Sequence, residues 1–294
     1  MIRISGYVNT TEEFFEAIRT NCLSFGYVTK YYSFSQKETI IENKKGKSIH
    51  LKMNSFRNIE MDCFPSYYNG VARDQQISSL NRGLNSTELQ KKPTIYFKDA
   101  NVYYDLSITD DRIACIYNIE GTWLSFYVGS FKPYSNLVDY PNPLFIGGNC
   151  APEEDISPHL LSSNNIVLGL DTSETLGYFQ ACLNQNNEWI MMSNQRENYN
   201  SIEYKLAIQP FYKNNPFENL SPDLNENQTI FPVIIQDVEN GFYLGEFDGI
   251  YSTSSKYSNN NNSTITFNSE VYKIVNVTSN ILGTENGMLA IRME

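Results

Sequence analysis

The sequence predicts an α+β fold that is predominantly antiparallel β, sandwich or barrel-like, with one N-terminal helix. Three observations predict it. The chain of 294 residues is 41% hydrophobic, enough for a real core. Its 21 Tyr and 17 Phe favour strands. Short apolar runs separated by turn residues follow one another directly, which is typical of a meander and not of alternating βαβ units.

The predicted helix covers residues 10–26. Thr10 and Glu13 have the spacing of a capping box, in which each side chain binds a free backbone N–H of the first turn. Gly26 is placed to end the helix. Its apolar residues recur at helical spacing and predict one buried face; they are Phe14, Phe15, Ile18, Cys22 and Leu23.

Short strands are expected after the helix, with polar turns between them. They cover residues 27–34, 38–42 and 48–53. The basic run Lys44–Lys47 is interpreted as a solvated hairpin turn. Residues 55–90 look like a loop or inserted arm. We therefore expect an N-terminal α+β region, 1–92, that carries this arm.

Residues 93–294 are expected to form a β-rich domain, with a possible split near 194–228. Asp110-Asp111, Glu120-Gly121 and Asn240-Gly241 supply turn chemistry between runs of strand residues. The expected strands are 94–97, 101–106, 112–118, 122–129, 165–169, 177–183, 189–192, 204–208, 229–237, 241–251, 263–267, 271–276 and 288–292. The tract Asn259–Asn262 is expected to be a mobile hairpin tip.

Composition excludes several classes of function. The formal charge of −11 argues against nucleic-acid binding, which needs a basic footprint. No signal peptide and no apolar run of membrane-spanning length is visible, so no membrane partner is expected. The five cysteines are scattered and predict buried reduced thiols. His50 and His159 lack a ligand at metal-site spacing, so we expect no metal and no cofactor.

Two motifs stand out. The first is Tyr127-Val-Gly-Ser-Phe-Lys-Pro-Tyr134, continued by Tyr140-Pro-Asn-Pro-Leu-Phe-Ile-Gly-Gly148. Its prolines fix backbone angles and predict an ordered crossover, and its glycine pair is interpreted as a turn. Tyr134 and Tyr140 would pack this crossover or offer platforms for sugar. The residues singled out in this motif are Gly129, Pro133, Tyr134, Tyr140, Pro141, Pro143, Gly147 and Gly148.

The second motif is Leu244-Gly-Glu-Phe-Asp-Gly-Ile-Tyr251. Glu246 and Asp248 would share one face of a strand, and paired carboxylates are what a glycosidase needs. Like charges close together would raise one pKa, as a catalytic acid requires. The alternative interpretation is that Gly245, Asp248 and Gly249 shape a bulge or strand end before Tyr251, and we favour it.

Both motifs resemble a family of uncharacterised structural proteins encoded among the virion and tail genes of tailed bacteriophages and prophages. The same family's chain end is similar to Tyr272-Lys-Ile-Val-Asn-Val277 followed by Met288-Leu-Ala-Ile-Arg292. Residues 55–90 match nothing in that pattern. The resemblance implies a virion component made in the host cytoplasm and no catalytic residues.

The expected function is therefore that of a virion structural protein of the tail or head–tail junction. It would form a ring by self-association and contact other tail or neck proteins. One alternative is a baseplate or fibre-attachment protein that binds host glycan through Tyr134, Tyr140 or Trp123. Another is a peptidoglycan-degrading virion enzyme that uses Glu246 and Asp248.

Overall fold

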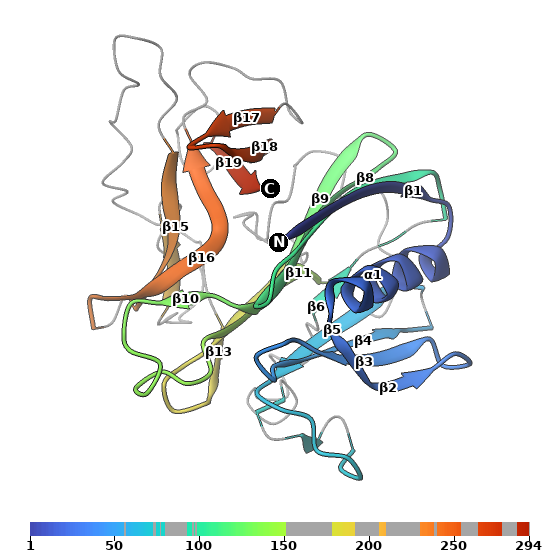
Figure 1. Ribbon diagram of the computed structural model, residues 1–294, viewed down its shortest axis with the longest axis horizontal. Helices are drawn as coiled ribbons and strands as arrows, with labels where there is room; N and C mark the ends of the chain where they lie inside the picture. The colour runs from blue at the N-terminus through green and yellow to red at the C-terminus, as the bar shows by residue number, and fades with distance from the viewer. Residues whose placement is uncertain are drawn as a thin grey trace, which may run out of the picture.

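A computed structural model describes most of the chain and confirms the predicted fold class (Figure 1). The described residues are 1–55, 57–72, 75–76, 78–79, 93–95, 97, 99–150, 178–191, 206–209, 230–237, 240–253, 264–277 and 287–293. Within them, one N-terminal α-helix accompanies two sheets in which every strand pair is antiparallel.

Helix α1 (Thr11–Phe25) begins and ends where the sequence predicts. The N–H of Glu13 donates to the Thr10 hydroxyl at 3.1 Å. The Glu13 carboxylate accepts the N–H of Asn9 at 2.6 Å, so the return bond of the capping box goes one residue further back than expected. Gly26 ends the helix with φ at 109°, a left-handed conformation that suits glycine.

The first sheet has twelve strands in the described part of the chain. Ten of them follow the order β1-β7-β8-β9-β11-β6-β5-β4-β3-β2, while β12 pairs with β11 and β13 with β12. The strands are β1 (Ile2–Val8), β2 (Val28–Ser33), β3 (Glu38–Glu42), β4 (Ser48–Met53), β5 (Ile59–Phe64), β6 (Pro93–Ile95), β7 (Val102–Ile108), β8 (Arg112–Ile119), β9 (Thr122–Ser130), β11 (Leu144–Cys150), β12 (Tyr178–Leu183) and β13 (Trp189–Met191).

This sheet forks at β11. One edge of β11 pairs with β12 from Phe145 to Asn149. The other edge pairs first with β9, up to Gly147, and then with β6, from Asn149. Two arms therefore part at Gly148, with β9, β8, β7 and β1 in one and β6 to β2 in the other. A Cβ atom on Gly148 would lie 2.8 Å from the terminal methyl group of Met61, so a side chain here would require the Met61 side chain to move.

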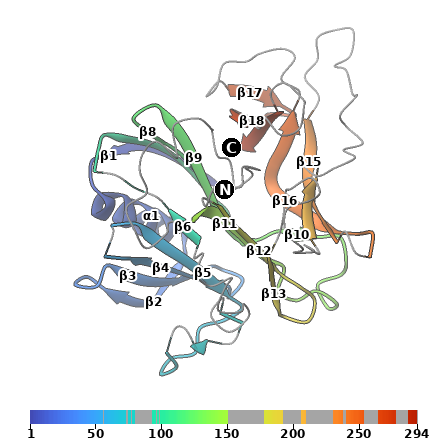
Figure 2. The same ribbon diagram turned by 180° about the vertical axis from the view of Figure 1, so that it is seen from behind.

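Helix α1 fills the space between the two arms (Figures 1 and 2). Phe14, Phe15, Ile18 and Cys22 are fully buried there and pack with inward side chains of both arms. Ion pairs also join the arms. Lys44 binds Asp110 at 3.2 Å and Lys45 binds Asp111 at 2.7 Å, so the basic turn that we interpreted as merely solvated ties one arm to the other.

The second sheet has the strand order β14-β15-β16-β19-β18-β17, and β10 pairs with β16. Its strands are β10 (Lys132–Pro133), β14 (Leu206–Gln209), β15 (Ile230–Asp237), β16 (Phe242–Thr253), β17 (Thr264–Phe267), β18 (Glu270–Val277) and β19 (Gly287–Arg292). Most were predicted to within two residues. The expected strand 165–169 and the tract 259–262 lie outside the described residues.

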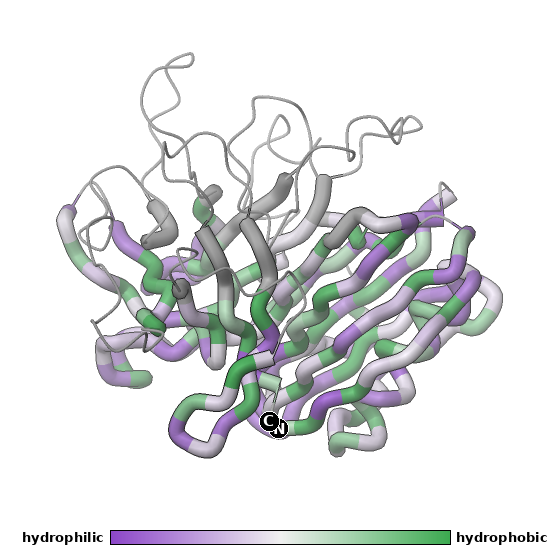
Figure 3. Tube along the Cα trace, turned by 90° about the horizontal axis from the view of Figure 1, so that it is seen from above, coloured by the Kyte–Doolittle hydropathy of each residue, from purple (hydrophilic) through white to green (hydrophobic). Residues whose placement is uncertain are grey.

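Helix α1 and the second sheet pack on opposite faces of the same strands of the first sheet. In β8, Ile113, Cys115 and Tyr117 point toward α1, whereas Ala114 and Ile116 point toward the second sheet. Figure 3 shows how hydropathy varies along the strands. The core between the sheets contains Ala114, Ile116, Tyr127, Phe131, Tyr140, Phe145, Cys182, Val233, Ile235, Phe247, Ile250, Ile291 and Met293. Strands covered on both faces explain the unbroken apolar runs Ile113–Tyr117 and Phe126–Val128.

Four points of the sequence analysis are corrected. Residues 2–8 form a strand that the sequence reading missed, and residues 59–64 form β5 and not part of a loop. Gly147 and Gly148 lie inside β11 and not in a turn, because the fork requires extended backbone there. The expected boundary at residue 92 crosses one sheet, since β5 pairs with β6. The chain enters the second sheet briefly at β10, returns to the first at β11, and the described strands from β14 onward all belong to the second sheet; the expected split at 194–228 includes β14.

Candidate functional site

The two motifs meet in space. In the strand pair β10–β16, Lys132 lies opposite Glu246 and Pro133 lies opposite Gly245. The N–H of Tyr134 donates to the carbonyl of Leu244 at 2.9 Å and extends the pairing. The crossover of the first motif is thus held against the strand of the second.

Gly245 allows this close approach. A Cβ atom there would lie 2.3 Å from the Lys132 carbonyl oxygen and 2.8 Å from the Phe131 ring. Any side chain at this position would push the crossover away from β16. Gly245 of the second motif is therefore explained by the close approach of the first motif's backbone.

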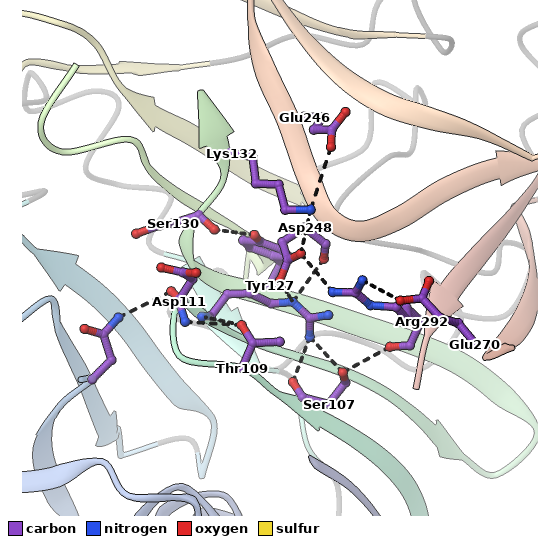
Figure 4. Close-up of polar contacts among 12 residues, drawn as sticks. Ser107, Thr109, Asp111, Tyr127, Ser130, Lys132, Glu246, Asp248, Glu270 and Arg292 are labelled. Atoms are coloured by element: carbon purple, nitrogen blue, oxygen red, sulfur yellow. Dashed lines mark hydrogen bonds and ion pairs between the residues drawn. The ribbon is translucent and has the colours of Figure 1, made fainter. Parts of the chain in front are cut away.

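A buried charged cluster joins the sheets beside this contact (Figure 4). The Arg112 side chain is fully buried. Its Nε donates to the Asp248 carbonyl at 3.1 Å, and its Nη1 donates to the carbonyl of Ser107 at 2.8 Å and to the hydroxyl of Ser107 at 2.9 Å. One guanidinium thus links β8 and β7 of the first sheet to β16 of the second.

Asp248 is the anionic centre of the cluster. Its carboxylate accepts a hydrogen bond from Arg292 Nη2 at 3.0 Å and lies 3.2 Å from Lys132 Nζ. Burial alone would raise the pKa of this carboxyl group, but Arg112, Lys132 and Arg292 together hold it below its ordinary value. Asp248 is therefore ionised at neutral pH.

Gly249 leaves room for the two guanidinium groups. Its φ of +69° is left-handed, and a Cβ atom would lie 3.1 Å from Arg112 Nη2 and 3.0 Å from Arg292 Cβ. The Asp248-Gly249 pair lies within β16, where the pairing with β15 shifts register between Tyr251 and Glu246, and not at a strand end.

A second buried ion pair joins the sheets nearby. The carboxylate of Asp105 on β7 is fully buried and binds the ammonium group of Lys273 on β18. Asp105 also receives hydrogen bonds from Arg3, Ser5 and Tyr103. Burial, together with the nearby Arg3 charge, lowers the pKa of Lys273 to about 8.

The geometry weakens the glycosidase alternative. Lys132 Nζ lies 3.8 Å from Glu246 and 3.2 Å from Asp248, so an ammonium group lies between the two carboxylates, and Asp248 is in addition paired with Arg292. A general acid needs a raised pKa, and that of Asp248 is lowered. In addition, Asp248 is buried, away from any substrate in solvent.

The two crossover tyrosines have different environments. Tyr140 is buried, and its hydroxyl donates to the carbonyl of Leu183. Tyr134 is 51% exposed, and its hydroxyl donates to Glu246 at 3.3 Å. Of the tyrosines named in the glycan-binding alternative, Tyr134 is therefore accessible to a ligand and Tyr140 is not. The side chain of Trp123 lies outside those that the structure describes.

The remaining motif residues are structural in their contacts. Pro143 is buried, and its carbonyl accepts the N–H of Phe131 at 2.9 Å. The carbonyl of Pro141 accepts a hydrogen bond from Lys47 at 3.1 Å. Tyr251 packs edge-on against Tyr272, with ring centroids 5.4 Å apart.

Metal and thiol chemistry find no support in the described residues. No group of three or more His, Cys, Asp and Glu residues there is arranged to hold a metal. His50 binds Glu38 at 2.9 Å, and His159 lies outside the described residues. Four cysteines are buried and free of disulfide bonds, namely Cys22, Cys63, Cys115 and Cys182.

Sequence reasoning missed Arg112, Asp105 and Lys273. Each is a charged residue within a run of apolar strand residues, such as Arg112-Ile-Ala-Cys-Ile-Tyr117. An isolated charge in a strand with two buried faces needs a buried partner. That pattern was the available signal, although the identity of the partner depends on how the sheets pack.

Comparison with known proteins assigns the chain to no family. No protein-family model matches the chain, and no curated protein matches it in sequence. Among the described residues, no helix has the length and apolar character needed to cross a membrane.

Replacing Tyr140 with Phe is expected to lower the free energy of unfolding by about 1–2 kcal/mol, because the buried Leu183 carbonyl loses a strong donor. Urea unfolding followed by fluorescence measures the change. Tyr134→Phe removes an exposed hydroxyl and should change stability by less than about 0.5 kcal/mol. Equal losses in both variants would contradict the assignment of Tyr140 to the core.

Proposed function

We propose that this protein is a structural component of a tailed-bacteriophage particle, at the tail or the head–tail junction. It acts by self-association and by contacts with neighbouring tail proteins. The family resemblance of the two motifs supports the setting, and an exposed apolar surface at their junction supports the mode of action.

That surface is the observation that carries the proposal, and we call it the crossover patch. It consists of exposed apolar residues from two neighbouring segments, the crossover and the start of β16, where successive side chains point to opposite faces. Its members are Tyr134, Leu137, Val138, Phe242 and Tyr243, with exposed fractions of 51%, 62%, 84%, 66% and 53%. Pairing of β10 with β16 brings the crossover and the β15–β16 hairpin to the same end of the second sheet. Aromatic and aliphatic side chains gathered on a surface mark a protein contact.

The buried contacts of the motifs agree with a structural role. Gly245, Asp248 and Gly249 hold the crossover and the charged cluster in place, so the crossover patch lies on backbone that is fixed by these contacts. A ring of identical subunits requires such a repeated, rigid contact.

The double change Leu137→Ser with Val138→Ser tests the proposal. Both side chains are exposed, so the fold should survive while the oligomer dissociates toward monomer. Light scattering coupled to size-exclusion chromatography measures the mass. Val71→Ser, an exposed valine outside the patch, should leave assembly unchanged.

Mass spectrometry of purified particles from the strain that encodes the chain tests the setting. The protein should be present at a fixed ratio to the other tail proteins. A wild-type chain that stays monomeric at high concentration, or its absence from the particles, would overturn the proposed function.

A further inference from the structure

The tip of the β15–β16 hairpin contains an Asn-Gly pair beside the crossover patch. Asn240 and Gly241 are both exposed, and the next residue, Phe242, belongs to the patch. Gly241 has a φ of +74°, and nothing lies within 4 Å of a Cβ atom added to it. The backbone nitrogen of Gly241 is therefore not shielded by a side chain at its own position.

This pair is able to undergo a spontaneous reaction. The Gly241 nitrogen attacks Cγ of Asn240, the Cγ–Nδ2 bond breaks, and ammonia leaves with the proton of the Gly241 N–H. The product is a succinimide ring. Water then opens the ring at either carbonyl and gives aspartate or isoaspartate, the isomer in which the backbone runs through the side chain. The only co-reactant is water.

One carboxylate restrains the reacting side chain. Asp237 Oδ2 accepts a hydrogen bond from Asn240 Nδ2 at 2.9 Å, and Asp237 Oδ1 accepts one from the Asn240 backbone N–H, also at 2.9 Å. Ring closure requires the Asn240 amide to turn toward the Gly241 nitrogen, and these two bonds restrict that rotation. Attack on Cγ also places negative charge on the amide oxygen, which a neighbouring carboxylate destabilises.

We propose that Asn240-Gly241 is a site of spontaneous isoaspartate formation and that Asp237 slows the reaction there. Asp237 is a positioning residue, because it acts on the orientation and the electrostatic surroundings of the amide and takes no part in bond exchange. This chemistry goes beyond the proposed function, since it does not require self-association.

Asn69-Gly70 is a control site within the same molecule. It also lies in an exposed turn, and Gly70 has a φ of +87° with nothing within 4 Å of an added Cβ atom. A hydrogen bond from the Val71 N–H to the Tyr68 carbonyl closes this turn. No described residue accepts a hydrogen bond from the Asn69 side chain. A change at Asp237 should therefore leave the reaction at Asn69 unaffected.

Asp237→Asn tests the proposal. The new amide keeps an oxygen acceptor for the Asn240 N–H but turns N–H donors toward Asn240 Nδ2. Both chains are incubated at mildly alkaline pH, and peptide mapping by mass spectrometry measures isoaspartate at the two Asn-Gly pairs. The rate at Asn240 should rise about three- to tenfold in the variant, while the rate at Asn69 stays unchanged. General loss of folded structure would instead raise both rates.

The wild-type chain alone gives a second measurement. Asn240 should react more slowly in the folded chain than in the chain unfolded by urea, where Asp237 no longer holds the amide. Absence of isoaspartate at Asn240 from both folded chains would overturn the site. Equal rates at Asn240 in the folded wild type and variant, or in the folded and unfolded wild type, would overturn the role of Asp237.

The reaction should also weaken the crossover patch. Isoaspartate lengthens the backbone by a methylene group and adds a carboxylate next to Phe242, which pairs with Asp237 across the hairpin. This consequence rests on the proposed function. Ion-exchange chromatography separates modified from unmodified chains, and light scattering should show weaker self-association of the modified fraction. Equal association of both fractions would overturn the effect on the patch, whereas a monomeric unmodified chain would overturn the proposed function and leave the isoaspartate result intact.

Discussion

Replacing Asp248 with Asn is expected to lower the free energy of unfolding by about 3–5 kcal/mol, because buried Arg112 and its neighbour Arg292 lose their shared anion. Asparagine has nearly the same shape, so the effect isolates charge from packing. Urea denaturation with an unchanged m-value measures the loss.

Glu246→Gln is the matched control for this change. It lies two residues away on the same strand, its side chain is 28% exposed, and it binds the same lysine. Its removal should cost less than about 1 kcal/mol, as is usual for a solvent-screened pair. Similar losses in the two variants would show that Asp248 is not the centre of the cluster.

The difference in stability between the wild type and Asp248→Asn should depend on pH in a defined way. The folded protein binds a proton at Asp248 more weakly than the unfolded chain, because three cations lower the pKa of this group from its ordinary 3.8. Its stabilising contribution is therefore complete above the unfolded pKa and is lost as the pH falls through the lower folded pKa. The stability difference between wild type and Asp248→Asn should persist at neutral pH and shrink in strong acid.

Replacing Gly129 with Ala is the second change with a large expected effect, about 2–4 kcal/mol of destabilisation. Its φ is +135°, and a Cβ atom would lie 2.4 Å from the Asp111 carbonyl oxygen and 2.6 Å from Arg112 Cα. Those atoms belong to backbone that also receives the N–H of Ser130 at 2.9 Å. The end of β9 would have to leave the β7–β8 turn.

Gly121→Ala separates backbone conformation from crowding. Gly121 also has a positive φ, +91°, but nothing lies within 4 Å of its added Cβ atom. Its replacement should cost about 1–2 kcal/mol, the ordinary penalty for a left-handed residue. Thermal unfolding of both variants measures the difference, and a Gly129 variant no less stable than the Gly121 variant would contradict the close approach.

Local patterns predicted the elements whose signals are local. The helix followed from its capping residues and apolar stripe, and most strands followed from apolar runs between turn residues. β5 was missed because Glu60 and Asp62 alternate with buried residues, which resembled a polar loop when taken alone. β1 was missed because seven residues at a chain end carry no turn signal before them.

The contacts that form the site could not be predicted from local sequence patterns. Gly148 looked like a turn because nothing in its neighbours reveals that Met61 approaches it. Arg112 and Asp248 are 136 residues apart in sequence, and their pairing follows from the way in which two sheets stack. The motifs were recognised as patterns, whereas their meeting at β10 and β16 required the fold.

The pairing of β1 with β7 has a consequence for how the chain folds. Ser5 and Asp105, which face each other across this pair and are joined by a hydrogen bond, are 100 residues apart. During synthesis the first strand and helix α1 emerge long before β7, so the buried face of the helix has only the β2–β5 arm to cover it. Such long-range pairing slows folding and prolongs the exposure of apolar surface. A newly made chain therefore most needs protection from aggregation in the period before β7 has been synthesised.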